Sequence, residues 1–427
     1  MAQHARWRVG AIALGLVLLA TACAGGSVDG ATGEGDDGGT APAGEAVEAV
    51  EAVDATTDTT IEDYPDAQTR ALQRLAAQPR PVPRSALPPR HLDAEQFPET
   101  LVERTLIVSG GVDPDAIAPI DEPWFEPVTD VDWLTDDEAV LVIELDDVAR
   151  AYPIRVMILH EIVNDTVGGL PVAVTYCPLC NSGVAVERTV GGEVLDFGTS
   201  GALYQSALVM YDRQTESLWT HFDGRAVVGD YLGEQLALVP MATVAWDDFR
   251  RDHPDGEVLG RIDPNQPYGR NPYGAYDSGD GPLAGFFRGE IDDRLAAMER
   301  VTGVQVAGHE TAVPLATASA EGVVPLDVDG ERVLVVWTPG LRSALDGDQV
   351  SDGADIGATA VFRTELPLTI DDTGADGPVL LDADAGRRWS TLGTPIGHEG
   401  PALEPVPHVD TFWFAWSTYH PQTALAG

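Results

Sequence analysis

The stretch Thr175-Tyr-Cys-Pro-Leu-Cys-Asn-Ser-Gly183 contains two of the three cysteines in a chain of 427 residues. An alternating apolar run precedes it over residues 170–176, and a second run follows it over residues 184–190. Alternation with a period of two is typical of β-strands. The stretch therefore predicts two strands joined by a tight connection that carries Cys177 and Cys180, with neither cysteine at the start of a helix.

Short alternating runs, separated by glycine and aspartate, continue along the chain from about residue 95. Residues 140–145 and 148–153 predict a hairpin, and the glycine pair at 168–169 predicts a further turn, because glycine readily adopts positive φ. Two short segments that end in His-Pro predict helices, with Thr243 and Thr411 as their N-caps. We expect a mainly β chain of the α+β class with short helices.

An internal duplication is the most informative pattern in the sequence. Residues 140–184 align without gaps onto residues 301–345 at a constant offset of 161. Further on, the two copies share residues at matching spacings, namely Asp212 with Asp382, Trp219 with Trp389, and His253 with His420. We expect two tandem related β-rich units that pack together. Residues shared by both units then serve the fold, and polar residues found in one unit are candidates for function.

Composition and pattern divide the chain into five segments. Residues 1–23 are expected to be a lipoprotein signal peptide and residues 24–92 a disordered tether, acidic and then proline-rich. Residues 93–257 form the first unit, which carries the cysteine pair, and residues 258–300 form a linker. Residues 301–427 form the second unit, which lacks the cysteines.

The first residues have the features of an export signal. Two arginines precede an apolar run over residues 9–20, which is too short for a permanent membrane span. The sequence Ala20-Thr-Ala-Cys23 is similar to the cleavage box of bacterial lipoproteins and predicts lipidation of Cys23. We therefore expect the lipid to anchor the protein to the outer face of the cytoplasmic membrane, where a cysteine pair can be oxidised.

The charge balance excludes one class of partner. The chain has 25 basic and 69 acidic residues, which gives a net charge of −44. Such a surface repels phosphate backbones, so no nucleic-acid partner is expected. The sequence identifies no protein partner.

Several donor residues of the first unit are missing from the second. At the aligned positions the second copy has Thr338 for Cys177, Leu341 for Cys180, Glu321 for His160, Gly322 for Glu161, Thr391 for His221 and Leu380 for Met210. We therefore predict a site in the first unit made of Cys177, Cys180, His160, His221 and Met210. The residues expected around it are Glu161, Asp165, Tyr176 and Asn181.

The pattern of the cysteine pair leaves three roles open. A static disulfide fits the reach of a tight turn, but so short a loop stabilises a fold only slightly. A metal site of two thiolates with imidazole and thioether donors favours copper or zinc. Thiol–disulfide exchange needs a thiol of lowered pKa, and without a helix N-terminus a neighbour such as His160 has to lower it.

Binding of copper or zinc is the leading hypothesis. The first alternative is a thiol redox protein that acts on exported proteins, and the second is a non-catalytic scaffold with a structural disulfide. Whether the protein is an enzyme is left open.

Several motifs together resemble a known prokaryotic family, domain of unknown function 3179. They are His160-Glu-Ile-Val-Asn-Asp165, the cysteine stretch, Phe197-Gly-Thr-Ser-Gly201 and Leu208-Val-Met-Tyr-Asp-Arg-Gln-Thr215. The resemblance covers about residues 130–425. It implies a fold shared with the family, whose members are often exported. It implies no activity.

Overall fold

The computed structural model describes residues 99–263, 265–328, 330–372 and 377–426. The predicted signal peptide, the lipidation site Cys23 and the tether lie outside these ranges. In the described ranges, no helix is long and apolar enough to cross a membrane.

The cysteine stretch forms the predicted hairpin. Strand β6 (Leu170–Cys177) pairs antiparallel with β7 (Ser182–Glu187), and Cys177 lies opposite Ser182. The four residues between the strands form the turn, which Asn181 closes with a φ of 51°. Asparagine tolerates this left-handed conformation better than most residues. The prediction of two strands joined by a tight connection is confirmed.

The described residues are mainly β, as the sequence predicted, and their strands form six sheets. The first sheet has the order β1 (Ile107–Ser109), β10 (Phe197–Tyr204), β11 (Ala207–Asp212), β12 (Leu218–Thr220), β13 (Ala226–Val228). The second has the order β14 (Leu238–Val239), β7, β6, β5 (Ile162–Val167). A two-stranded ribbon joins β8 (Thr189–Val190) and β9 (Glu193–Val194).

The largest sheet has nine strands. Its order is β19 (Val323–Val328), β20 (Glu331–Thr338), β21 (Ala358–Arg363), β15 (Ala242–Ala245), β3 (Ala139–Leu145), β4 (Val148–Pro153), β16 (Glu257–Leu259), β2 (Phe125–Pro127), with β26 (Glu404–Pro405) also paired to β21. A further sheet has the order β27 (His408–Phe412), β17 (Arg300–Val306), β18 (His309–Pro314), β28 (Ala424–Leu425). The last has the order β22 (Leu368–Asp371), β23 (Val379–Asp382), β24 (Arg388–Trp389), β25 (Pro395–Ile396).

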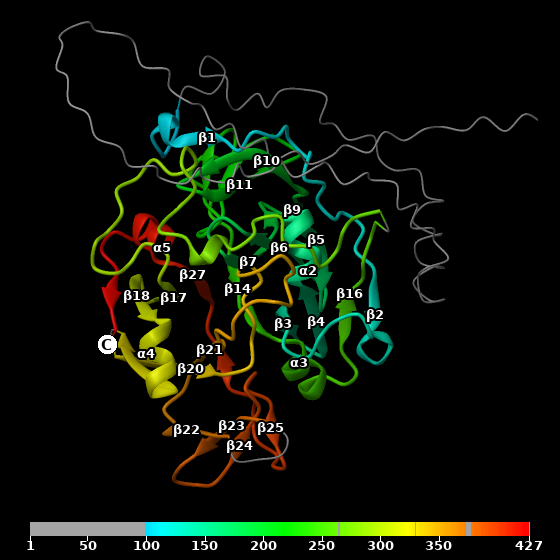
Figure 1. Cartoon of the computed structure of the whole chain (residues 1–427), viewed down its shortest axis with the longest axis vertical. Helices are drawn as coiled ribbons and strands as arrows, with labels where there is room; N and C mark the ends of the chain where they lie inside the picture. The colour runs from blue at the N-terminus through cyan, green and yellow to red at the C-terminus, as the bar shows by residue number, and fades with distance from the viewer. Residues whose placement is uncertain (1–98, 264, 329, 373–376, 427) are drawn as a thin grey trace, which may run out of the picture. The chain divides into compact units, whose positions relative to one another are not determined.

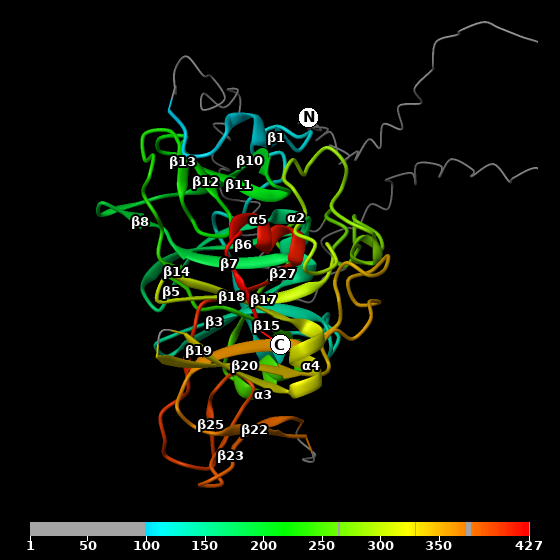
Figure 2. The same ribbon diagram turned by 90° about the vertical axis from the view of Figure 1, so that its left-hand side faces the viewer.

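Both ribbon views place these sheets in the same succession. Strands β1, β10 and β11 lie at one end and β22 to β25 at the other, with the sheets of β6, β3 and β17 between them (Figures 1 and 2). In the described part of the chain, four α-helices of seven residues each accompany the strands: α2 (Ile154–His160), α3 (Trp246–Asp252), α4 (Leu315–Glu321) and α5 (Trp413–Tyr419).

The same succession of elements occurs twice. Elements β3, β4, α2, β5 and β6 are followed, 161 residues later at every bound, by β17, β18, α4, β19 and β20. Strand β3 pairs with β15 and β4 runs parallel to β16, just as β17 pairs with β27 and β18 runs parallel to β28. This is the arrangement that a duplication predicts. Descent of the two halves from one ancestor stays a prediction.

The two halves are joined through a shared sheet. Strand β15 of the first half pairs with β21 of the second, so strands from both sides of the irregular segment between β16 and β17 lie in the nine-stranded sheet. Strand β27 of the second half in turn lies against β7. Each half therefore packs its strands against the other.

The prediction of threonine N-caps was wrong. Thr243 and Thr411 lie in β15 and β27, and the helices begin only at Trp246 and Trp413, with no side-chain cap. The first N–H groups of α3 donate instead to the backbone carbonyls of Glu138 and residue 136. Tertiary contacts thus satisfy the N–H groups that a capping side chain would otherwise satisfy.

Candidate cysteine site

The hairpin presents both cysteines to the protein interior. Cys177 is 2% exposed and Cys180 is fully buried, and the two thiols are free. The backbone N–H of Leu208 on β11 donates to Cys177 Sγ at 3.3 Å. Cys180 Sγ instead lies 3.0 Å from Ser182 Oγ. The two sulfurs therefore have different polar neighbours.

These neighbours shift the pKa values of the two thiols in opposite directions. Burial raises the pKa of a thiol, but at Cys177 hydrogen bonds outweigh burial and lower the pKa below its ordinary value. The donors are the Cys180 thiol and the N–H groups of Cys180, Leu208 and Leu179. Burial, together with the hydrogen bond to Cys177, raises the pKa of Cys180. The arrangement favours a thiolate at Cys177 and a thiol at Cys180.

A buried chain of hydrogen bonds leads away from Cys180. Ser182 Oγ lies 2.8 Å from His221 Nε2, and His221 Nδ1 lies 3.3 Å from Thr175 Oγ1. The Thr175 hydroxyl donates to the Val184 carbonyl, and His221 Nε2 also lies 3.3 Å from the Ser182 carbonyl oxygen, so both ring nitrogens have polar neighbours. Burial lowers the pKa of His221 to about 4, which keeps the ring neutral.

Glu161 is a buried carboxyl group with a positive φ and a raised pKa. It follows α2 with a φ of 60°, a left-handed conformation for which its counterpart in the second half is Gly322, with a φ of 74°. A non-glycine residue in this region costs about 1 kcal/mol. Burial, and secondarily the charge of Cys177, raise the pKa of Glu161 to about 8. Glu161 thus combines a positive φ, burial and a raised pKa next to Cys177, which makes it a candidate site residue.

Three tyrosines surround the sulfurs. Tyr176 precedes Cys177, and its hydroxyl donates to Asn181 Oδ1 at 3.0 Å. Tyr273 and Tyr276 come from the irregular segment between β16 and β17, and the Tyr276 hydroxyl donates to the Leu179 carbonyl at 2.9 Å. Burial raises the pKa of all three, so they are neutral phenols. They enclose the pair in a mostly apolar setting.

The second half holds the cysteine turn in place. The Thr411 hydroxyl donates to the Cys180 carbonyl at 2.7 Å, and the Phe412 N–H donates to the same oxygen at 3.2 Å. With Tyr276 on Leu179, two carbonyls of the turn are thus bound by residues far along the chain. The turn is therefore fixed from outside its own hairpin, which preorganises the N–H groups that face Cys177.

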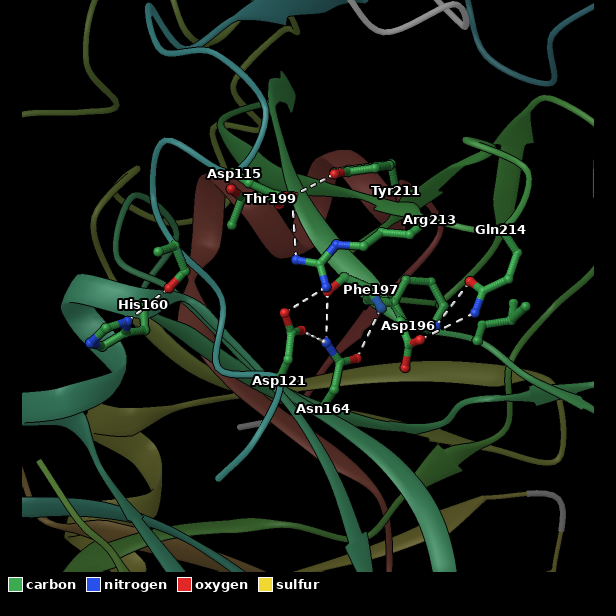
Figure 3. Close-up of polar contacts among 12 residues, drawn as sticks. Asp115, Asp121, His160, Asn164, Asp196, Phe197, Thr199, Tyr211, Arg213 and Gln214 are labelled. Atoms are coloured by element: carbon green, nitrogen blue, oxygen red, sulfur yellow. Dashed lines mark hydrogen bonds and ion pairs between the residues drawn. The ribbon is translucent and has the colours of Figure 1, made fainter. Parts of the chain in front are cut away.

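His160 does not belong to the cysteine site. Its Nδ1 donates to the Ala118 carbonyl at 2.7 Å, and its Nε2 lies 2.9 Å from the Tyr268 hydroxyl. Both ring nitrogens are therefore occupied. Figure 3 shows the ring directed toward the segment that contains Asp115 and Asp121, beside the clasp formed by Asn164 and Arg213.

The clasp holds loop 115–121 against the first half. Arg213 lies 2.7 Å from Asp121 and 3.3 Å from Asp115, and Tyr211 donates to Asp115 at 2.6 Å (Figure 3). Asn164 joins Asp121 to the backbone of β10. Asn164, Tyr211 and Arg213, which lie in motifs that carry the family resemblance, thus hold this loop in place.

The remaining predicted residues lie in different places. Asp165 accepts from Arg150 at 2.8 Å and from Tyr152 at 2.6 Å, in an ion pair away from the sulfurs. Asn181 closes the cysteine turn and binds Tyr176. Met210 is buried on β11, in the same apolar cluster as the two cysteines.

Across the described parts of the chain, the two cysteine sulfurs belong to no group of three close His, Cys, Asp or Glu donors. The imidazole nearest the pair, His221, has both nitrogens in hydrogen bonds, with Ser182 between its ring and Cys180. Among the described residues, the only group of three close His, Cys or carboxylate donors is Glu144, Asp252 and His253, which lies elsewhere. A tetrahedral zinc site needs three or four such ligands. Within the ranges that the structure describes, the pair therefore lacks the further His, Cys or carboxylate ligands of a tetrahedral zinc site, while the predicted thioether donor Met210 lies in the same apolar cluster.

Removal of the Arg213 side chain should destabilise the fold. Arg213→Met leaves Asp115 buried without its cation, so we expect a loss of about 3 kcal/mol in the free energy of unfolding, measured in urea. Arg225→Met removes an exposed pair with Asp223 at 3.6 Å and should cost less than about 1 kcal/mol. Equal losses in the two variants would contradict this account of the clasp.

Sequence reasoning missed four residues of the site. Ser182 and Thr175 lie within the quoted stretch, but their types are too common to mark a site, and only the register of β6 and β7 orients them. Tyr273 and Tyr276 lie in residues 258–300, which the sequence predicted to be a linker. Because they contact the hairpin from about 100 residues away, no local pattern could place them.

A comparison with protein families gives one match. A family model described as "Protein of unknown function (DUF3179)" matches residues 114–423. No curated protein and no solved structure matches the chain.

Proposed function

The chain belongs to the DUF3179 family, which brings no activity with it, and we propose from the geometry of the hairpin that Cys177 and Cys180 form a thiol–disulfide redox centre. The observation that supports this most directly is the setting of Cys177. Its sulfur accepts the Leu208 N–H and faces the Cys180 thiol, so a thiolate is stabilised without a helix N-terminus. The thiolate is the attacking form in disulfide exchange.

The first step joins Cys177 to the substrate. The thiolate attacks one sulfur of a disulfide R–S–S–R′, forms a mixed disulfide and expels R′S⁻. Glu161, with a pKa of about 8, is protonated at neutral pH and lies beside Cys177. It supplies the proton that the departing thiolate takes up.

The second step closes the internal disulfide. As the Cys180 sulfur attacks Cys177, the bond from Cys177 to the substrate sulfur breaks, and the departing RS⁻ takes up the Cys180 proton and leaves as RSH. The Ser182 hydroxyl beside Cys180 Sγ orients the attacking thiol. His221 holds the Ser182 hydroxyl in position and is a positioning residue. Two electrons pass from the two thiols to the substrate disulfide, which becomes two thiols.

The setting of this chemistry follows from the N-terminal signal. If Cys23 is lipidated, the centre works outside the cytoplasmic membrane, where disulfide exchange with exported proteins takes place. Both sulfurs are buried beside Tyr273 and Tyr276, so a small disulfide reaches Cys177 more readily than a folded protein does.

Copper or zinc binding is the competing proposal. It is supported by the adjacency of two sulfurs and weakened, for zinc, because no third His, Cys or carboxylate donor of the described residues lies close to them. The two proposals predict different results for the same purified mature protein.

The deciding experiment combines elemental analysis with redox titration. We expect less than about 0.1 metal ion per chain. In glutathione buffers the two thiols should oxidise reversibly to a disulfide, with a reduction potential of the pair above about −300 mV. A stoichiometric metal, or a pair that never oxidises, would refute the redox centre. A potential well below about −300 mV would indicate an inert structural bridge.

A further inference from the structure

A cavity of about 500 Å³ lies in the second half, at the start of α4. Its walls include Met298, Glu299, Leu315, Ala316 and Trp337. Helix α4 packs against β17, β18 and β20, and both ribbon views show it beside β20 (Figures 1 and 2). The cavity is separate from the described contacts of the cysteine pair.

The first half shows what occupies the equivalent space. There Arg155, the second residue of α2, donates through Nε and an Nη to the two carboxylate oxygens of Glu138, each at 2.6 Å. Ala316 is the second residue of α4, and Glu299 precedes β17 as Glu138 precedes β3. The second half thus keeps the carboxylate but replaces the arginine with alanine.

Matching backbone contacts support this correspondence. The Glu138 carbonyl accepts from the Trp246 N–H at 2.9 Å, and the Glu299 carbonyl accepts from the Trp413 N–H at 2.7 Å. The N–H of each glutamate donates to the carbonyl three residues earlier. The two glutamates therefore occupy the same place in their halves.

The Glu299 carboxylate has no internal cation. Within the described ranges, no hydrogen bond or ion pair joins it to another side chain, whereas Glu138 is fully buried under Arg155. The neighbouring Arg300 already binds Asp277 at 2.7 Å and Ser343 at 2.8 Å. Arg300 itself also lines the cavity, with its charge paired to Asp277. A further carboxylate, Asp355, and the Trp337 ring face the same space and attract a cation.

We propose that this cavity binds a monosubstituted guanidinium, which pairs with Glu299 as Arg155 pairs with Glu138. A guanidinium offers two parallel N–H groups to one carboxylate, and the open space admits the alkyl chain that Arg155 supplies in the first half. The chemistry is common to a small alkylguanidine and to an arginine side chain of a peptide.

The test is calorimetric titration of the mature protein with agmatine and, separately, with the peptide Gly-Arg-Gly. We expect agmatine to bind with a Kd of about 1 mM or tighter, and butylamine at least about fivefold more weakly, because an ammonium cannot pair with both oxygens. Tighter binding of the peptide identifies a protein ligand, and tighter binding of agmatine identifies a small molecule.

Two substitutions and a control complete the test. Ala316→Arg supplies the guanidinium internally and should abolish agmatine binding, and Glu299→Gln should weaken it at least about tenfold. Glu321→Gln, at an exposed position of the same helix, should leave binding unchanged. Thermal unfolding verifies that each variant is folded. No binding at 10 mM agmatine, or binding that survives Glu299→Gln, would overturn the proposal.

Discussion

A Cys180→Ser variant should accumulate a stable mixed disulfide with glutathione, whereas Cys177→Ser should form none. The reason is the asymmetry of the pair, because hydrogen bonds lower the pKa of Cys177 below its ordinary value, whereas burial and the contact with Cys177 raise the pKa of Cys180. We expect Cys177→Ser to lower the rate of exchange with glutathione disulfide by about 100-fold or more, because it removes the attacking sulfur. Intact-protein mass spectrometry identifies the trapped species, and circular dichroism verifies the fold.

A Cys180→Ala variant gives the matched control. Serine at position 180 keeps a hydroxyl donor toward Cys177 and alanine removes it, so the pKa of Cys177 should be higher in the alanine variant. The pH dependence of alkylation by iodoacetamide measures that pKa. Equal trapping at both cysteines, or identical profiles for serine and alanine, would contradict the assigned roles.

Glu161→Gln should remove a loss of stability that the parent chain undergoes at alkaline pH. The folded pKa of about 8 lies above the ordinary value of 4.5, so the folded state holds a proton that the unfolded state releases. This contribution is complete below about pH 4.5 and declines as the pH rises toward 8. Between pH 6.5 and 8 the expected loss is about 2 kcal/mol, and it should be absent from the glutamine variant.

The effect of His221 on the pH dependence of stability has the opposite sign. It determines the pH range in which the effect of Glu161 can be measured alone. Its folded pKa of about 4 lies below the ordinary 6.5, so its stabilisation is complete above pH 6.5 and is lost as the pH falls toward 4. Above pH 6.5 only the slope from Glu161 remains of these two.

Urea unfolding at pH 6.5, 7.25 and 8 checks the prediction. It is best measured in a Cys177→Ser background, which removes titration of the thiol, while burial, the larger cause of the Glu161 shift, remains. Glu321→Gln should retain the slope of its parent. A Glu161→Gln variant that also loses about 2 kcal/mol would show that Glu161 does not titrate in this range.

The fold was largely predictable because its strands carry local signals. Alternation over residues 140–153 and 170–190 identified both hairpins, and the glycine pair identified the turn between β5 and β6. Helix starts were not predictable from threonine, since the N–H groups of α3 find carbonyls in another segment. The pairing of β15 with β21 brings together residues more than 100 apart, and no local pattern encodes it.

The site was predictable in its centre and less so in its surroundings. The absence of Cys177, Cys180 and Glu161 from the second copy marked residues that do meet in space. The same criterion selected His160, which binds loop 115–121 instead. A residue can be absent from one copy because that copy lacks a structural partner, and sequence alone does not separate this case from chemistry.

The cysteine turn lies in the first half of the chain, and residues of the second half hold it in place. A fragment that ends near residue 260 would contain both thiols, Ser182 and His221, yet it would lack the donors that Thr411 and Phe412 direct at the Cys180 carbonyl. The half without cysteines therefore braces the cysteine turn from outside its own hairpin. A truncated protein of this kind should keep both cysteines but no longer hold the turn in the conformation that shifts the two thiol pKa values in opposite directions.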